Sequence, residues 1–191
     1  MNAEYKLDIA AVEVKQADPK VQQLLVSTQK NMGFIPNMYA NMANSYGLLD
    51  SYIKGYDLFR NETDFSAIEQ EVILLTISQE NGCDYCVAAH SFVADNMSKV
   101  PTAVTDAIRN DEPIPDSRLA ALSAFTRTLL QKRGFPNNAD VEQFLAAGYQ
   151  QHHILEIILA ISVKTISNYA NHIFHTELDE VFSPRQWSEA S

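Results

Sequence analysis

The sequence has few cysteines and no dense run of basic residues, and these two shortages exclude several classes of protein. Only two of its 191 residues are cysteine, so it has no disulfide framework of the kind that holds small secreted domains together. A chain of this length needs none, because it can bury roughly 70% of its unfolded surface on folding. Both thiols are therefore available for chemistry.

Positive charge is also scarce. The chain has 14 basic and 24 acidic residues, a net charge of −10, and the basic residues form no block. Such a charge repels a nucleic-acid backbone and an anionic membrane surface alike. We therefore expect small molecules or other proteins as partners, and neither nucleic acid nor a membrane.

Long apolar runs are missing as well. The longest, at 154–163, is interrupted by Glu156 and ended by Lys164, and the first 15 residues carry charges throughout. Neither segment has the apolar length of a membrane span or of a signal-peptide core. We expect a cytoplasmic protein, in which two cysteines placed three residues apart form a reactive or metal-binding pair.

What the sequence does have is helical periodicity. Apolar residues recur with a period of 3.6 in almost every segment between turn signals, and the alternation typical of strands is confined to 12–14. This predicts a single all-α domain over 1–191, with N-terminal helices within 18–60, a core motif at about 66–98 and a C-terminal helix at 151–175. The expected helices are 19–32, 37–60, 66–81, 83–98, 102–109, 116–132, one capped by Asn138 that ends near 147, and 151–175, followed by a polar tail at 177–191.

A pair of thiols and an imidazole share one helix face. Cys83, Cys86 and His90 fall within about 60° of one another at 100° per residue. The amino terminus of a helix stabilises a nearby thiolate, and an adjacent histidine can take or return the proton. The spacing predicts a nucleophilic thiolate at neutral pH.

Glu71 lies on the apolar face of the preceding helix, whose start at Ser66 has the pattern of a capping box with Glu69. A carboxylate in this position either has a partner or has its pKa raised by desolvation, and a raised pKa suits proton transfer near pH 7. The turn at 81–82 folds this helix against the one that begins at Cys83. Glutamate, thiols and imidazole can therefore meet.

Other interpretations remain open at this stage. The two cysteines could bind zinc with His90 or with the pair His172 and His175, although no second C-x-x-C exists and that pair lies about 80 residues away. A thioredoxin-like motif needs a strand before its first cysteine, and here a helix is predicted. Taken singly, Glu71 could be structural and His90 could cover a helix surface. Their coincidence with the cysteines favours a redox site without metal or cofactor.

The last predicted helix changes character halfway along. Isoleucines at 154, 157 and 161 share one face. The continuation of that face carries polar residues, namely Lys164, Asn168, Asn171, His172 and His175. Either these residues form the wall of a pocket opposite the thiols, or the helix emerges into solvent, where terminal histidines favour its dipole.

The pattern Glu71-x11-Cys83-x2-Cys86-x3-His90 resembles the active-site signature of the alkyl hydroperoxidase D branch of the carboxymuconolactone decarboxylase superfamily. Two further segments resemble members of this superfamily. The stretch 33–37 is similar to the start of the long helix in its "peroxidase-related" members, and 168–172 to its last helix. Resemblance at three points in the same order is more specific than a C-x-x-C alone.

The resemblance implies a compact all-α subunit that assembles into trimers or hexamers, with the disulfide-forming pair near a subunit interface. It implies that peroxide oxidises Cys86, that Cys83 is the resolving thiol and proton donor, and that Glu71 and His90 relay protons. Tyr85 stands where some members have histidine, so one acid-base group is missing and a modest peroxidase rate is expected. With Asn168 and His172, Tyr85 is a candidate pocket-lining residue.

The expected function is therefore that of a thiol-dependent peroxidase that reduces alkyl hydroperoxides. Thiolate attacks peroxide, the sulfenic acid condenses with the neighbouring thiol, and an external dithiol restores the pair. The alternative is a non-enzymatic redox-sensing or binding subunit of the same fold. A carboxymuconolactone-type decarboxylase is less favoured, because that branch generally lacks the cysteine pair, and so is a zinc-binding protein.

Overall fold

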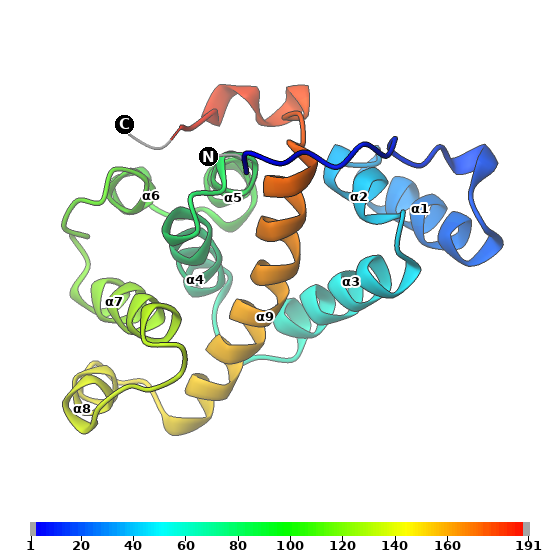
Figure 1. The fold of residues 1–191 in the computed structure, drawn as a ribbon. Coiled ribbons are helices and arrows are strands. Elements are labelled where there is room, and N and C mark those ends of the chain that lie inside the picture. Colours follow the sequence, from blue (N-terminus) through cyan, green and yellow to red (C-terminus); the bar gives the residue numbers. More distant parts are fainter. Residues whose placement is uncertain (1–2, 189–191) are drawn as a thin grey trace.

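The computed structural model describes residues 3–188, which form helices joined by short segments and contain no strand (Figure 1). The predicted all-α fold is confirmed. Within the same residues, no helix is both long and apolar enough to cross a membrane. In chain order the elements are η1 (Val14–Gln16), α1 (Pro19–Met32), α2 (Asn37–Met42), α3 (Tyr46–Asn61), α4 (Ala67–Glu80), α5 (Asp84–Val93), the π-helical turn η2 (Ala94–Ser98), α6 (Thr102–Arg109), α7 (Ser117–Gln131), α8 (Asn138–Ala146), α9 (Gln151–Phe174) and η3 (Glu180–Arg185).

Local side-chain bonds fix where the helices begin. At the start of α4, the predicted capping box is present: Ser66 accepts from the backbone N–H of Glu69, whose carboxylate accepts from the N–H of Ser66. The sequence had suggested Asn138 as the cap of α8, but the cap is Asn137. Asn137 makes the reciprocal pair of bonds with Asp140, three residues on, which Asn138 at the first helical position does not make.

The helix predicted over 37–60 is two helices, α2 and α3, with a break at 43–45. Asn44 explains the break, because its side-chain amide donates to the carbonyls of Ala10 and Asn41, at 2.9 and 3.1 Å. A side chain that bonds the backbone in this way competes with helix continuation. Ser45 then adopts extended backbone angles and starts α3 in a new direction.

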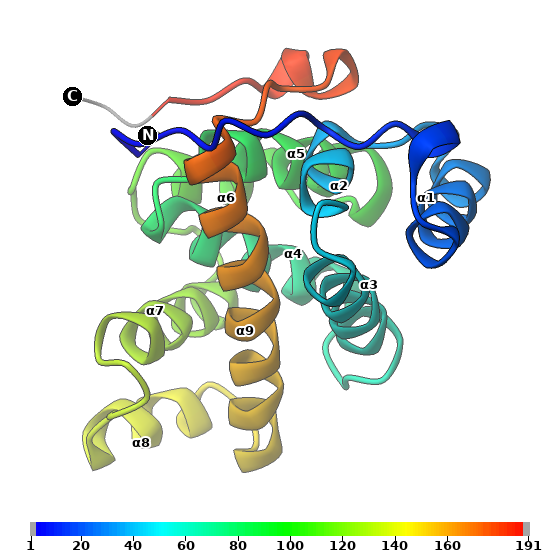
Figure 2. The ribbon, with the colours of Figure 1, turned by 45° about the vertical axis from the view of Figure 1, so that its right-hand side comes forward.

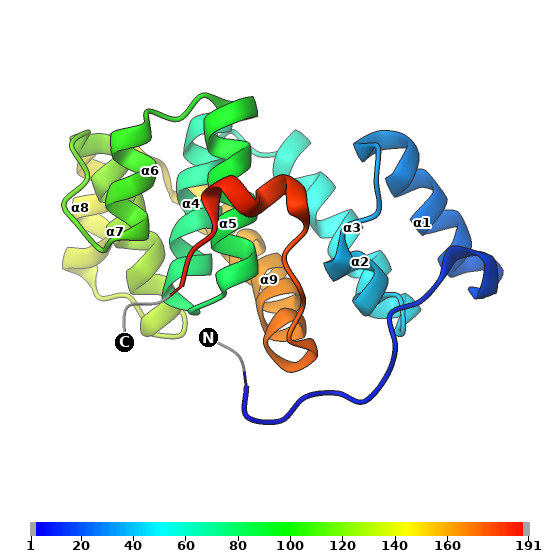
Figure 3. The ribbon, with the colours of Figure 1, turned by 90° about the horizontal axis from the view of Figure 1, so that it is seen from above.

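The tail predicted at 177–191 is more structured than expected over its described part, 177–188. Its 3-10 helix η3 packs against α5, and Phe182 is buried there. The rings of Phe34, Tyr85 and Phe92 surround Phe182 with centroid distances of 5.7–6.1 Å. This segment crosses above α5 in Figure 3. Phe182 thus anchors a mainly polar segment, together with ion pairs from Arg185 to Asp95 and Asp106.

Helix α9 runs the length of the molecule, with α7 and α8 on one side and α2 and α3 on the other (Figure 2). Helix α4 packs on α5, α6, α7 and α9, and its residues from 69 to 78 are all buried. Where α3 crosses α9, a Cβ on Gly55 would come within 2.8 Å of Val163 Cγ2. Glycine therefore allows these two helices to approach closely.

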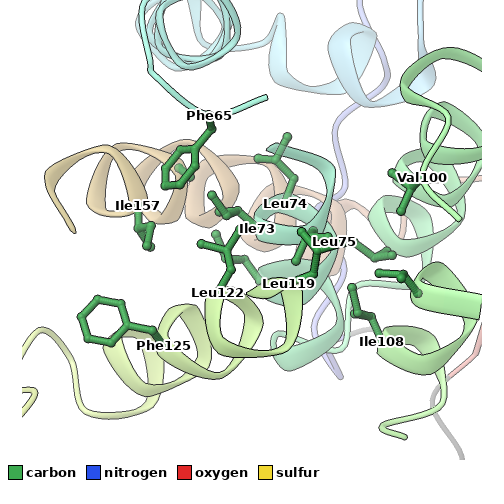
Figure 4. Close-up of a cluster of buried hydrophobic side chains, with 14 of the residues drawn as sticks. Phe65, Ile73, Leu74, Leu75, Val100, Ile108, Leu119, Leu122, Phe125 and Ile157 are labelled. Atoms are coloured by element: carbon green, nitrogen blue, oxygen red, sulfur yellow. The ribbon is translucent and has the colours of Figure 1, made fainter. Parts of the chain in front are cut away.

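The buried side chains form two clusters. The first, here called the structural cluster, is mainly aliphatic and joins α4, α6, α7 and α8 to the first half of α9; Ile73, Leu122, Phe125 and Ile157 are among its members (Figure 4). The second, here called the site cluster, joins α1, α2, α3 and α5 to the second half of α9. Its buried members are Val21, Leu25, Met38, Tyr39, Met42, Ala43, Leu49, Tyr52, Cys83, Tyr85, Cys86, Ala88, Val163, Ala170 and Phe182.

Candidate active site

The two cysteines lie at the start of α5, where the turn after α4 brings the chain back. Cys83 is the N-cap residue of α5, Cys86 lies in its first turn, and His90 follows one turn later. Both sulfur-bearing residues are buried, with 0% and 2% of their surfaces exposed, and their thiols share a hydrogen bond. The structure thus brings together the three groups that the spacing had placed on one face.

Glu71 is 1% exposed and has two charged or ionisable partners. One carboxylate oxygen accepts from the Arg60 guanidinium, and the other lies 2.9 Å from His90 Nδ1. Burial alone would raise the pKa of Glu71, but His90 and Arg60 together hold it below its ordinary value. The sequence predicted either a partner for this carboxylate or a pKa raised by desolvation. The structure shows the first: Glu71 has partners and is ionised.

Arg60 was not identified from the sequence, although it positions Glu71. Its guanidinium also donates to the hydroxyl of Tyr56 at 2.6 Å and to the side chain of Gln70 at 3.2 Å. Gln70 in turn donates to the carbonyls of Arg60 and Phe65. The only sequence signal was weak: Arg60 follows Tyr56 by four residues, the spacing at which helical side chains meet.

His90 is buried beside these charges. Burial lowers its pKa, the positive charge of Lys164 lowers it further, and Glu71 acts in the opposite direction; the net pKa lies below the ordinary value. The imidazole is therefore neutral at neutral pH. Because ionised Glu71 can only accept at Nδ1, the ring proton lies on Nδ1 and the lone pair of Nε2 is left for the thiol site.

Lys164 is fully buried in the middle of α9, and its ammonium nitrogen makes no hydrogen bond of ordinary geometry with residues 3–188. Burial opposes ionisation of Cys86, yet the hydrogen bond from Cys83 and the positive charge of Lys164 lower the pKa of Cys86 well below its ordinary value. Burial and the neighbouring thiolate raise the pKa of Cys83. The site therefore holds one thiolate, Cys86, and one thiol, Cys83.

The second half of α9 forms a polar wall beside the sulfurs. Asn171 Nδ2 lies 3.3 Å from Cys86 Sγ, and the Cys86 thiol lies 3.9 Å from the hydroxyl of Ser167. Asn168 is buried and accepts from the side chain of Asn81 at 2.8 Å. Over 164–171 the polar face of the helix therefore faces the thiols and is buried. Only at its end does His175 cap it, donating from Nε2 to the carbonyl of Ala3.

A cavity of about 400 Å³ opens beside Cys86 and His90. This volume lies within the range of small-molecule sites, and the lining is largely apolar, as such sites usually are. The side chains around it are Met32, Pro36, Met38, Tyr39, Tyr52, Tyr56, Arg60, Tyr85, Ala89, Val93, Met97, Ser98, Lys164 and Phe182. An apolar molecule can thus reach the thiolate.

Residues 3–188 also contain a group with the composition of a metal site, far from the thiols. His152, His153 and Glu156 bring their ligand atoms within 4.8 Å of one another at the start of α9. The lone pair of His153 Nδ1 already accepts from the backbone N–H of Gln150, at 2.9 Å. Glu156 accepts from the N–H of Asp64. These bonds account for the cluster without a metal.

This protein is therefore a helical bundle with a buried C-x-x-C pair, beside which lie a glutamate and an imidazole. Residues 52–127 match the model of the Carboxymuconolactone decarboxylase family, and this stretch includes Glu71, Cys83, Cys86 and His90. Over these residues the chain is similar to this family, as the motif had predicted. The comparison with curated proteins gives no match.

Solved structures share the fold over nearly the whole chain. An uncharacterized peroxidase-related protein from Ralstonia eutropha JMP134, described as an alkylhydroperoxidase AhpD core, has a TM-score of 0.81 at 21% identity, covering 91% of this chain and 93% of that one. A peroxidase-related protein from Silicibacter sp. TM1040 has a TM-score of 0.75 at 20% identity, covering 93% and 95%. The debrominase Bmp8 has a TM-score of 0.74 at 15% identity, covering 94% and 96%.

Proposed function

We propose that this protein is a thiol-dependent peroxidase that reduces alkyl hydroperoxides through Cys86 and Cys83. One observation carries the proposal: a buried thiolate, Cys86, lies beside the positive charge of Lys164 and lines an apolar cavity large enough for an organic hydroperoxide. The thiolate is the nucleophilic form of cysteine. A cation beside it also stabilises the negative charge that develops on the departing oxygen.

The chemistry begins when the Cys86 thiolate attacks the terminal oxygen of the hydroperoxide. The O–O bond breaks, Cys86 becomes a sulfenic acid, and the alkoxide takes the proton of the Cys83 thiol and leaves as an alcohol. The Cys83 thiolate then attacks the sulfur of Cys86, a disulfide forms and hydroxide leaves. The peroxide has gained two electrons, and the two cysteines have lost them.

Glu71 and His90 supply the remaining proton transfers. Because Cys86 is already ionised and His90 neutral in the reduced protein, His90 Nε2 relays a proton from solvent to the hydroxide that leaves at the end. Ionised Glu71 holds Nδ1–H, fixes the ring tautomer and stabilises the imidazolium while it exists. Arg60 keeps the carboxylate ionised and in place. Tyr85, Asn168 and His172 have no proton-transfer role in this oxidative half of the cycle.

The proposal includes an external dithiol that reduces the disulfide, and a homo-oligomer, trimer or hexamer, in the cytoplasm. The apolar surface of α9 supports an assembly, because Leu155, Ile158, Tyr169 and Ile173 recur at helical spacing on it and are exposed. Exposed apolar stripes of this kind mark interfaces between proteins.

The experiment is a stopped-flow reaction of the reduced protein with cumene hydroperoxide, followed by thiol titration. We expect two thiols to be consumed per peroxide, no reaction in Cys86→Ser, and a trappable sulfenic acid in Cys83→Ser. Unchanged turnover in Cys86→Ser would refute the proposal. Oxidation that occurs once, without turnover when dithiol is supplied, would indicate the redox-sensing alternative.

The likeness to the debrominase suggests a second candidate reaction, the reductive removal of halogen from an aromatic ring. The observation that favours it is the ring-rich lining of the cavity beside Cys86, where four tyrosines can contact a flat aromatic molecule. Two thiols would supply the two electrons and become a disulfide as halide leaves. Release of bromide from 2,3,4-tribromopyrrole, a compound bound by a variant of Bmp8, tests this reaction directly.

A further inference from the structure

The two cysteines face different cavities. Cys86 lines the apolar cavity described above, whereas Cys83 lines a second, smaller one of about 150 Å³. This second cavity lies between the start of α5, the end of α9 and the C-terminal segment after η3. Its remaining lining residues are Asp84, Tyr85, Asn171, His172, Thr176, Leu178, Gln186, Trp187 and Ser188.

Tyr85 lies between the two cysteines in sequence and lines both cavities. Its hydroxyl donates to the carboxylate of Asp179 at 2.5 Å, and the same carboxylate accepts from the backbone N–H of Asn37. The tyrosine is therefore held as a wall between the two cavities. A molecule in one cavity does not reach the cysteine that lines the other.

The smaller cavity also contains a group suited to activating a thiol. Burial lowers the pKa of His172, so its imidazole is neutral at neutral pH. Its Nε2 has no hydrogen-bond partner among the residues that the structure describes. A buried imidazole nitrogen without a partner can accept a proton from a thiol that enters this space.

We propose that the smaller cavity is the reductant site: a slender, uncharged dithiol enters between α5, α9 and the C-terminal segment, gives a proton to His172 and attacks the sulfur of Cys83. This inference rests on the proposed redox cycle of the pair. It assigns separate entrances to the oxidant and the reductant. It also gives His172 and the C-terminal segment a role in the second half of that cycle.

The bond changes follow the ordinary course of thiol–disulfide exchange. The first thiolate of the dithiol bonds to Cys83 Sγ, the Cys83–Cys86 bond breaks, and Cys86 leaves as a thiolate. The second thiol of the reductant then attacks the reductant sulfur bound to Cys83. The cyclic disulfide departs, Cys83 takes the proton held by His172, and the other proton goes to solvent. The dithiol has lost two electrons and the protein disulfide has gained them.

The pKa of Cys86 is lower than that of Cys83, and this difference favours attack of the reductant on the sulfur of Cys83. Exchange is faster when the departing sulfur belongs to the thiol of lower pKa. Cys86 is that thiol, because Cys83 and Lys164 stabilise its anion. Attack on Cys86 from the apolar cavity would instead expel Cys83, the thiol of higher pKa. The sulfur lining the smaller cavity is therefore the better target.

The size and charge of the smaller cavity limit the class of reductant. A volume of about 150 Å³ admits a short thiol-bearing chain and excludes a folded protein. The carboxylate of Asp84 lines the cavity, and the chain as a whole has a charge of −10. Both repel anionic thiols. An uncharged dithiol such as dithiothreitol is the appropriate probe.

Two exposed lining residues, one in each cavity, provide matched tests. Gln186 is an exposed residue of the smaller cavity, and Met97, 72% exposed, is one of the larger. In Gln186→Trp we expect reduction of the disulfide by dithiothreitol to slow roughly tenfold, because a bulky side chain hinders access to the sulfur. Oxidation by cumene hydroperoxide should not change. Met97→Trp should have the opposite effects, and the alanine variants at both positions should behave as the unmodified protein.

A third variant tests His172. His172→Gln should slow reduction by roughly tenfold or more, with a smaller loss for a dithiol of lower pKa, whose proton needs less assistance. The disulfide is formed with diamide, so reduction can be measured even if the protein does not react with peroxide and the proposed peroxidase function fails. The inference is overturned if Met97→Trp slows both half-reactions while Gln186→Trp slows neither.

Discussion

The two buried clusters of this protein differ in how their polar groups are satisfied. Beside the structural cluster, the hydroxyls of Thr76 and Ser123 bond to each other at 2.8 Å, and Thr126 donates to the carbonyl of Leu122. The buried Thr105 hydroxyl on α6 is an exception, with no hydrogen-bond partner among residues 3–188. Beside the site cluster, four polar atoms on α9 have no hydrogen-bond partner among residues 3–188. They are Lys164 Nζ, Asn168 Nδ2, Asn171 Oδ1 and His172 Nε2.

This difference separates stability from function. An unpaired buried polar group costs about 1–3 kcal/mol and a buried charge costs more, so a core that serves only stability avoids both. The second half of α9 carries such groups next to two thiols. Its first half, which packs into the structural cluster, is apolar at Ile157 and Ala160. One helix thus supports the fold at one end and the chemistry at the other.

The strongest test of the site cluster removes the carboxylate on which its charges depend. Glu71→Leu leaves the Arg60 guanidinium largely buried without its partner, and breaking a buried ion pair in this way costs about 3–5 kcal/mol. Urea unfolding should show the loss, and the double variant Glu71→Leu with Arg60→Met should recover much of it. A single variant as stable as the unmodified protein would show that this pair is not a buried charge pair.

The matched change in the structural cluster should reduce stability without affecting the thiols. Leu122 is fully buried between α4 and α7, and Leu122→Ala should lower the free energy of unfolding by about 2–5 kcal/mol. The rate at which Cys86 reacts with peroxide at a temperature where the variant is folded should not change. An altered rate would mean that the two clusters are coupled through α4.

Sequence patterns were sufficient for most of the fold, because helices in this chain begin and end with local signals. The capping box at Ser66 and the proline at the start of α1 lie within a few residues of the boundaries they set. The break between α2 and α3 was missed because its cause is distant: Asn44 bonds to Ala10, 34 residues earlier. Periodicity carries no information about such a partner.

The site was predictable to the extent that its groups lie on α5 and on the helix before it. Cys83, Cys86 and His90 lie on α5, and their spacing alone placed them together. Arg60 and Lys164 act on the same groups from α3 and α9. The sequence placed Lys164 on the polar face of the last helix but left open whether that face met solvent, and it gave no role to Arg60. A lone basic residue in an amphipathic pattern normally lies at the surface, so the structure was needed to show that both are buried beside the site.

Lys164 offers a test in which function and stability move in different directions. Lys164→Met removes the positive charge beside Cys86, so the pKa of Cys86 should rise. Once that pKa exceeds the pH of the assay, each further unit lowers the thiolate fraction, and with it the rate of the peroxide reaction, roughly tenfold. Stability should be unchanged or greater, because a buried charge without a hydrogen bond is lost. Ultraviolet titration of the thiolate measures the shift, and Lys164→Arg, which keeps the charge, is the control. A large loss of stability in Lys164→Met would place Lys164 with the structural residues.

The smallest expected effect is the part of the pH dependence of stability that originates in Glu71 and His90. The folded pKa of Glu71 lies below its ordinary 4.5 and that of His90 below its ordinary 6.5. Below about pH 6.5 the unfolded chain therefore binds more protons than the folded one, and the free energy of unfolding should fall as the pH is lowered from 7 to 4. In His90→Gln the fall between pH 7 and 5 should be shallower, whereas Leu122→Ala should lower the whole curve and keep its slope. Urea unfolding at several pH values measures both. If Leu122→Ala flattened the slope as His90→Gln does, the pH dependence would not belong to the site.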